Sequence, residues 1–173
     1  MNRLLKRVRF NVRAKVGMSN EAVEHLCSQL CTKRFQGVFS ADRIPTRRLS
    51  KLGDFVIVVN LGKSDMPVGH FVALSKRSMD NYVEYMDSFA LPCFQPDVKK
   101  FVAACSSDKT ARCTVKKRVQ SMNSAYCGLY AALFAAYKDR EEEMDFELKF
   151  NKRELTGNDN RCVDYLRRII KEM

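Results

Sequence analysis

Cys127 is the residue of this sequence best placed to act as a nucleophile. It directly precedes an Ala- and Leu-rich stretch in which apolar residues recur at helical spacing. Free amides and the positive end of the dipole at a helix start favour a thiolate there. Thiols that are also paired with an imidazole titrate near pH ~3 to 4 instead of ~8.5. Cys127 is therefore the candidate nucleophile, and its backbone amide is a candidate donor to an oxyanion.

His70 and Asp87 are candidates for the base and for the group that orients it. They lie on two apolar, strand-like runs separated by a polar stretch over 75–81, which predicts a hairpin. A turn symmetric about Ser78 and Met79 places His70 directly opposite Asp87, with Cβ atoms about 4.5 to 5.5 Å apart. A carboxylate there fixes the imidazole tautomer and leaves the other nitrogen free as a base. The prediction depends on register, because one bulge would undo it.

Gln120 and Gly128 complete the constellation. Gln120 lies seven residues before Cys127 and offers a side-chain amide as a second oxyanion donor. Gly128 would let a substrate backbone approach closely. Each feature also has an ordinary structural interpretation, because a cysteine before an apolar helix is commonly a core residue and a His and an Asp on a hairpin are commonly a surface pair. The residues alone leave both interpretations open.

The elements that must position these residues follow from periodicity and turn signals. Helices are expected from Ser19 or Asn20 to about 33, over 96–105, from Cys127 onward and from Asn160 onward. Strands are expected over 55–59, 70–74, 82–86 and 115–119. The segment 35–51 lacks clean periodicity and predicts an irregular surface stretch.

Composition indicates one globular domain of mixed type with a basic surface. At 173 residues the chain suits a single domain over 19–173, preceded by a basic arm over 1–18. The net charge of +11 favours a polyanionic partner such as DNA, although a merely solubilising surface has the same composition. Seven cysteines without a secretory signal favour a reducing, intracellular compartment. Neither a metal site nor membrane insertion is expected.

Four segments resemble those of adenovirus proteases, the adenains. The segment Val119–Leu129 resembles the family's nucleophile motif, with the Gln, the Asn-Ser and the Cys-Gly in matching places. Gly69–Phe71 is similar to the histidine segment, and Tyr85–Phe89 to the acidic segment. Phe35–Asp42 is similar to a segment that precedes the first strands. The resemblance spans roughly 23–137, and the order His, acid, Gln, Cys agrees with it.

The resemblance implies an α+β fold of the papain-like superfamily in permuted order, with a central mixed sheet flanked by helices. It implies peptide-bond hydrolysis through a thioester, with Cys127 as nucleophile, His70 as base and then acid, Asp87 as orienting group and Gln120 in the oxyanion hole. Family members process virion precursor proteins, and adenoviral enzymes are stimulated by DNA and by a short viral peptide. The expected location is therefore the virion and the host-cell nucleus or viral assembly site.

The chain also departs from the family pattern. Phe71 stands in place of the usual Trp, Asp87 where Glu is common and Met122 where Pro is common, and the C-terminal part is shorter. These differences indicate a relative from another DNA virus or a virus-like transposon, and they leave peptide activation open. Cys113 lies in the region where adenoviral enzymes bond their activating peptide, and it is expected to be a solvent-facing loop cysteine.

Two other functions remain open. One is a deconjugating protease for SUMO or another ubiquitin-like modifier, since the wording Tyr-x-Asp-Ser around Asp87 suits that group. Those enzymes usually have Asp before the nucleophile and a shorter Gln-to-Cys interval, whereas this chain has Tyr126. The other is a nucleic-acid-binding virion protein whose protease-like site is idle.

Overall fold

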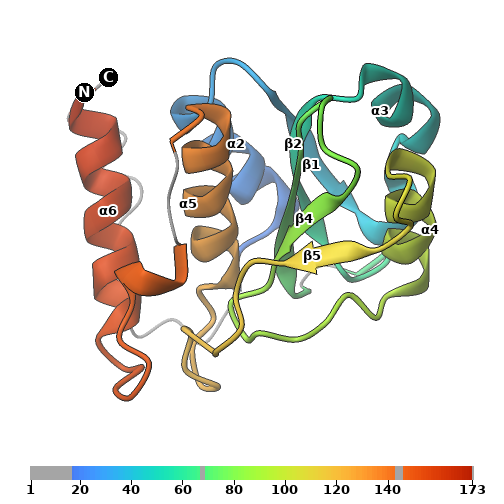
Figure 1. Ribbon diagram of the computed structural model, residues 1–173. Coiled ribbons are helices and arrows are strands. Elements are labelled where there is room, and N and C mark those ends of the chain that lie inside the picture. Colours follow the sequence, from blue (N-terminus) through green and yellow to red (C-terminus); the bar gives the residue numbers. More distant parts are fainter. Residues whose placement is uncertain (1–16, 67–68, 143–145, 173) are drawn as a thin grey trace.

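The computed structural model describes residues 17–66, 69–142 and 146–172. They form a mixed α+β fold around one five-stranded sheet (Figure 1). Nearly all of the expected basic arm over 1–18 lies outside the described residues, which include only its last two positions.

The sheet has its strands in chain order and mixes both kinds of pairing. β1 runs parallel to β2, β3 runs antiparallel to both β2 and β4, and β5 runs parallel to β4. Every residue of β2 and β3 is buried, as expected of central strands covered on both faces. The strands are β1 (Phe35–Ser40), β2 (Phe55–Asn60), β3 (Phe71–Lys76), β4 (Val83–Met86) and β5 (Ala111–Cys113).

Helices cover both faces of the sheet (Figure 1). On one face lie α2 (Asn20–Leu30), α5 (Cys127–Asp139) and α6 (Asn158–Glu172), and on the other lie α3 (Thr46–Leu52) and α4 (Pro96–Cys105). Two short 3-10 helices span Ala41–Arg43 and Phe146–Lys149. Each face has its own apolar core, so the sheet separates two clusters of buried side chains.

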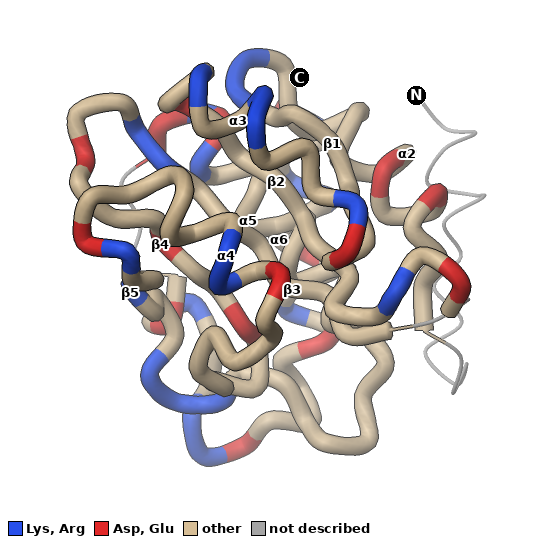
Figure 2. Tube along the Cα trace, turned by 90° about the vertical axis from the view of Figure 1, so that its right-hand side faces the viewer, with Lys and Arg blue, Asp and Glu red and all other residues tan. Residues whose placement is uncertain are grey.

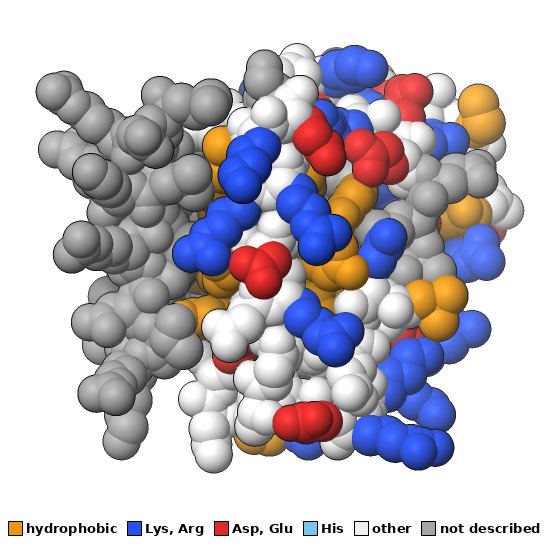
Figure 3. All heavy atoms as spheres, turned by 90° about the vertical axis from the view of Figure 1, so that its left-hand side faces the viewer, with side chains coloured by type: hydrophobic (Ala, Val, Ile, Leu, Met, Phe, Trp, Pro, Cys, Tyr) orange, Lys and Arg blue, Asp and Glu red, His pale blue; other side chains and the backbone are white. Residues whose placement is uncertain are grey.

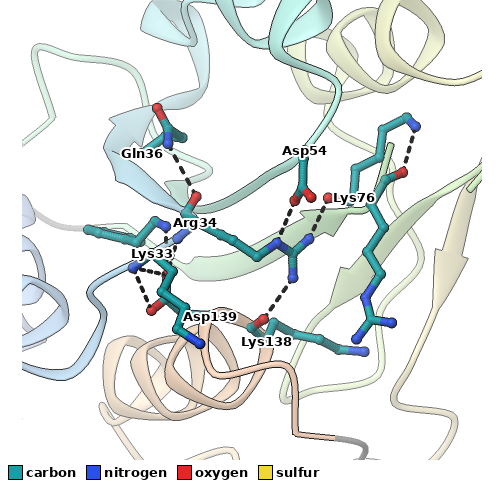
Figure 4. Close-up of polar contacts among 9 residues, drawn as sticks. Lys33, Arg34, Gln36, Asp54, Lys76, Lys138 and Asp139 are labelled. Carbon is teal, nitrogen blue, oxygen red and sulfur yellow. Dashed lines mark hydrogen bonds and ion pairs between the residues drawn. The ribbon is translucent and has the colours of Figure 1, made fainter. Parts of the chain in front are cut away.

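The central helix α5 is apolar on all sides because it lies between the sheet and α6. Its last residue, Asp139, is fully buried and accepts hydrogen bonds from four successive amides, those of residues 32–35, at 2.5 to 3.0 Å (Figure 4). Arg34 donates to the carbonyls of Lys138 and Lys76 and pairs with Asp54. These contacts fix α5 along its axis, and therefore also fix the position of Cys127 at its other end.

Most expected elements are confirmed, with boundaries shifted by a few residues. Ser19 caps α2, its hydroxyl accepting from the amide of Ala22, and the helix ends at Leu30, three residues early. The helix over 96–105 and the helix that begins at Cys127 are both present, and α6 begins two residues before the expected start.

Two expectations about segments were wrong. The stretch 35–51 is not irregular, because it holds β1 and most of α3. The sequence of β1 lacks a regular alternation of apolar residues. This strand lies at the sheet edge, carries Gly37 at φ 132° and has a register irregularity between Phe35 and Val38. No strand forms over 115–119, and the fifth strand lies earlier, at Ala111–Cys113. Val115 and Val119 are buried in an irregular segment, so the sequence there has the apolar pattern of a strand without forming one.

The register of the β3–β4 hairpin also differs from the expectation. Leu74 pairs with Tyr85 and Ala73 with Met86, which moves the centre of the turn one residue later, between Met79 and Asp80. Lys76 explains part of this shift, because its ammonium donates to the carbonyls of Arg77 and Asp80 and holds the six-residue loop. Continued to the strand ends, this register places Val72, not His70, opposite Asp87.

Candidate active site

His70, Asp87 and Cys127 meet at one end of the sheet. His70 immediately precedes β3 and Asp87 immediately follows β4, so the antiparallel pairing of these strands brings them to the same end. Cys127 is the first residue of α5, the helix that packs on β3. Sheet and helix together therefore assemble three residues that are up to 57 positions apart in the sequence.

His70 reaches Asp87 as a diagonal neighbour and not as the directly opposed residue. Its Nε2 lies 2.9 Å from Asp87 Oδ1. Diagonal positions of an antiparallel pair are ~7 to 8 Å apart between Cα atoms, within reach of an imidazole and a carboxylate. Both hydrogen bonding and charge contribute to this contact, because each raises the pKa of the imidazole. The expected pair is present, although the register predicted for it was wrong.

Phe89 explains how the ring is held. It occupies the position opposite His70 in the observed register, and the two rings stack with centroids 5.0 Å apart and planes 30° apart. The amide of Phe89 donates to Asp87 Oδ1 at 2.8 Å, and the Tyr85 hydroxyl approaches Oδ2 at 3.5 Å. The Asp87 side chain is 1% exposed, so these donors replace water around the carboxylate.

The pKa of His70 reflects its position between Asp87 and Cys127. Burial alone would lower this pKa, but the interactions with Asp87 and Cys127 outweigh it and raise the pKa from 6.5 to about 9. The thiol of Cys127 is therefore close enough to the imidazole to influence its pKa. Since Nε2 lies against Asp87, Nδ1 is the ring nitrogen that remains for the thiol. A raised pKa of this kind favours the cationic imidazole at neutral pH.

The start of α5 is tightly packed against its neighbours. A Cβ atom on Gly128 would lie 2.9 Å from Val23 Cγ2 and 3.4 Å from Phe71 Cδ2. Packing against α2 and β3 therefore favours glycine at position 128, whereas the role in substrate approach stays a prediction. Cys127 itself is 9% exposed, at the edge of this contact.

Gln120 lies beside this group but is fully buried. Its Nε2 donates to the carbonyl and the hydroxyl of Ser124 at 2.9 and 3.1 Å, and its Oε1 accepts from the Ser88 hydroxyl at 2.5 Å. Its amide nitrogen thus points toward the 121–126 loop that leads into Cys127. The side chain is held at both ends.

Sequence reasoning missed Ser88, Phe89 and Ser124. Phe89 could have been found only from the correct register. Ser88 is adjacent to Asp87, but an isolated serine gives no signal of its partner. The hydroxyl of Ser124 also accepts from the amide of Tyr126, which orders the turn before Cys127.

The described residues contain no candidate metal-binding site. They contain no group of three or more His, Cys, Asp and Glu side chains arranged to hold an ion. All seven cysteines are described and are free thiols. Cys113 is half-buried on β5 and not on a loop as expected. None of the described helices is long and apolar enough to cross a membrane.

Comparison with solved structures gives remote similarities. No family model and no curated protein matches the chain. The SUMO protease Ulp1, solved with its catalytic cysteine oxidised to a sulfenic acid, aligns over 92% of this chain and 81% of its own with 12% identity and a TM-score of 0.49. AvrA delL154 with IP6 and CoA aligns over 70% of this chain with 18% identity and a TM-score of 0.43. The chain spans about half of AvrA, 47%. These likenesses assign no activity or partner to this chain.

Proposed function

We propose that the chain is a cysteine endopeptidase of the papain-like superfamily in permuted order, with Cys127 as nucleophile. The observation that carries this proposal is the contact of His70 with Asp87 beside a cysteine at the start of a buried helix. A cationic imidazole and a helix N-terminus both favour a thiolate. A cysteine that only fills the core would need neither a cationic imidazole nor a helix N-terminus beside it.

In the proposed reaction the Cys127 thiolate attacks the carbonyl carbon of the scissile peptide bond. The oxyanion that forms accepts from the Cys127 amide and from Gln120 Nε2. His70 gives its proton to the leaving amine as the C–N bond breaks, which leaves a thioester. His70 then takes a proton from water, whose oxygen attacks the thioester and releases the acid product and the thiolate. Asp87 stabilises the imidazolium throughout. No metal or small-molecule cofactor takes part.

We propose virion precursor proteins, such as capsid or core precursors, as the substrates, with cleavage in the virion and the host-cell nucleus or viral assembly site. The support is the resemblance of Val119–Leu129 to the nucleophile motif of the adenains, including the seven-residue interval from Gln120 to Cys127. The rival substrate is a SUMO-like modifier, favoured by Tyr85, Asp87 and Ser88.

A cleavage assay on two substrate panels separates these activities. One panel holds peptides with small residues next to the cut, and the other holds precursors of ubiquitin-like modifiers. Cys127→Ala and His70→Ala should each abolish cleavage, whereas Cys162→Ala, which removes a fully buried thiol between α6 and the core, should leave the catalytic rate unchanged. Cleavage that survives Cys127→Ala would overturn the proposal.

We further propose that DNA binds the basic surface and stimulates the enzyme. A concavity of about 560 Å³ is lined by the basic residues Arg112, Lys116, Lys117, Lys138 and Lys152. Two of these bases are paired with acids of the same concavity, Lys138 with Glu84 at 2.6 Å and Lys152 with Glu147 at 2.9 Å. The excess positive charge therefore comes from Arg112, Lys116 and Lys117. Figure 2 shows Lys and Arg positions on loops at the lower left of the view, and Figure 3 shows further cations spread over the face formed by α6.

The idle-site alternative shares this DNA-binding surface and differs only in the chemistry. Exchanging Lys116 and Lys117 for Glu should weaken binding to a short DNA duplex and reduce the salt dependence of that binding. An endopeptidase would then lose its stimulation by DNA but keep its basal rate. An idle protein would show no cleavage under any condition, including addition of an activating peptide.

A further inference from the structure

A buried serine connects the acid of the proposed site with its oxyanion donor. Ser88 directly follows Asp87 and is fully buried. Its hydroxyl donates to Gln120 Oε1 at 2.5 Å. Its carbonyl accepts from the amides of Val119 and Gln120 at 3.0 and 3.2 Å. One residue therefore holds both the backbone and the side chain of Gln120.

The hydrogen bonds of Gln120 allow only one orientation of its amide group. The carbonyl of Ser124 can only accept, so the group 2.9 Å from it must be the amide nitrogen. The oxygen then faces Ser88, whose hydroxyl donates to it. Both acceptors of the nitrogen belong to Ser124, so donation to an oxyanion requires that one of the two amide hydrogens does not serve Ser124.

The backbone at Val119, directly before Gln120, is also held by hydrogen bonds. Asn158, fully buried at the first position of α6, donates through Nδ2 to the carbonyl of Val119 at 2.7 Å. The amide of Val119 donates to Ser88. The peptide groups around Gln120 are thus held by a residue beside Asp87 and a residue on α6, which leaves Gln120 little freedom to turn.

We propose that Ser88 is a positioning residue that aims the amide nitrogen of Gln120 at the oxyanion. The inference rests on the proposed function, because it names how one donor of that reaction is oriented. Ser88 touches no reacting atom and acts through Gln120 alone. A residue of this kind lowers turnover without weakening substrate binding, and it leaves the thiolate unaffected.

The experiment compares two reactions of the same thiol in Ser88→Ala. Peptide hydrolysis forms an oxyanion, whereas alkylation of Cys127 by iodoacetamide is a substitution at a methylene carbon and forms none. Ser88→Ala should lower kcat about 3- to 10-fold, the effect of one lost hydrogen bond, with KM and the alkylation rate unchanged. Gln120→Ala should lower kcat about 10²- to 10³-fold. Adding Ser88→Ala to Gln120→Ala should then change nothing further.

Ser106→Ala is the matched control, since this buried serine directly follows α4 and donates to the carbonyl of Val102 in that helix. It should leave kcat unchanged. The inference is overturned if Ser88→Ala has the wild-type kcat, or if its full effect persists in Gln120→Ala. An equal fall in alkylation would also overturn it, because that indicates a general loss of structure. Failure of the proposed function is distinguishable, since it would appear as hydrolysis that is absent in the wild type or survives Cys127→Ala.

Discussion

Replacing Gly128 by alanine tests how tightly the start of α5 packs against α2 and β3. The new Cβ would lie 2.9 Å from Val23 Cγ2, 3.3 Å from Met18 Sδ and 3.4 Å from Phe71 Cδ2. Overpacking of this severity costs about 2 to 3 kcal/mol. The higher helix propensity of alanine offsets up to about 1 kcal/mol. The free energy of unfolding should therefore fall by about 1 to 2 kcal/mol.

Urea unfolding followed by circular dichroism measures this change, and Gly157→Ala is the matched control. A Cβ on Gly157 would meet no atom within 4 Å, so that variant should stay within about 0.5 kcal/mol of the wild type. Val23→Ala removes the nearest clashing atom, so the double variant with Gly128→Ala should be more stable than the sum of the two single changes predicts. A Gly128→Ala variant as stable as the wild type would refute the reasoning.

Three further predictions concern the buried charges. Asp139→Asn should lower the free energy of unfolding by about 2 to 4 kcal/mol, because a neutral amide replaces a carboxylate that accepts four backbone amides; a loss below about 0.5 kcal/mol in urea unfolding contradicts this. Asp87→Asn should lower the pKa of His70 from about 9 toward 6.5, measured by NMR titration with His25 as the second imidazole signal; an unchanged midpoint contradicts it. Since the folded pKa of His70 lies above its unfolded value, its stabilisation is complete below pH 6.5 and is lost as the pH rises through 9. The stability difference between wild type and Asp87→Asn should therefore shrink over that range, and a constant difference argues against the contact.

The sequence predicted the centre of the molecule better than its edges. The all-apolar run of β2 and the helical spacing after Cys127 are strong signals because both elements are buried on every side. β1 and β5 lie at the two edges of the sheet, and β5 has only three residues, so neither shows a regular alternation. Residues 115–119 were misread because burial in an irregular segment leaves the same apolar pattern as a strand.

For the site, residue types were predictable and geometry was not. His70, Asp87 and Cys127 could be selected from their chemistry and from the elements they flank. The loop contacts of Lys76 with the carbonyls of Arg77 and Asp80 accompany the observed register, and no local pattern reveals them. The pairing of His70 with Asp87 was predicted despite the wrong register, because long side chains also reach a diagonal neighbour across two strands.

Labelling of the folded protein with iodoacetamide at pH 6, followed by peptide mapping, tests the central claim most directly. A thiolate held by the His70 imidazolium should react rapidly at Cys127 alone, and His70→Ala should abolish this selectivity. Cys27 and Cys162 serve as internal controls, because burial raises the pKa of both thiols well above the ordinary value. Slow labelling of Cys127, or labelling that does not depend on His70, would contradict the account.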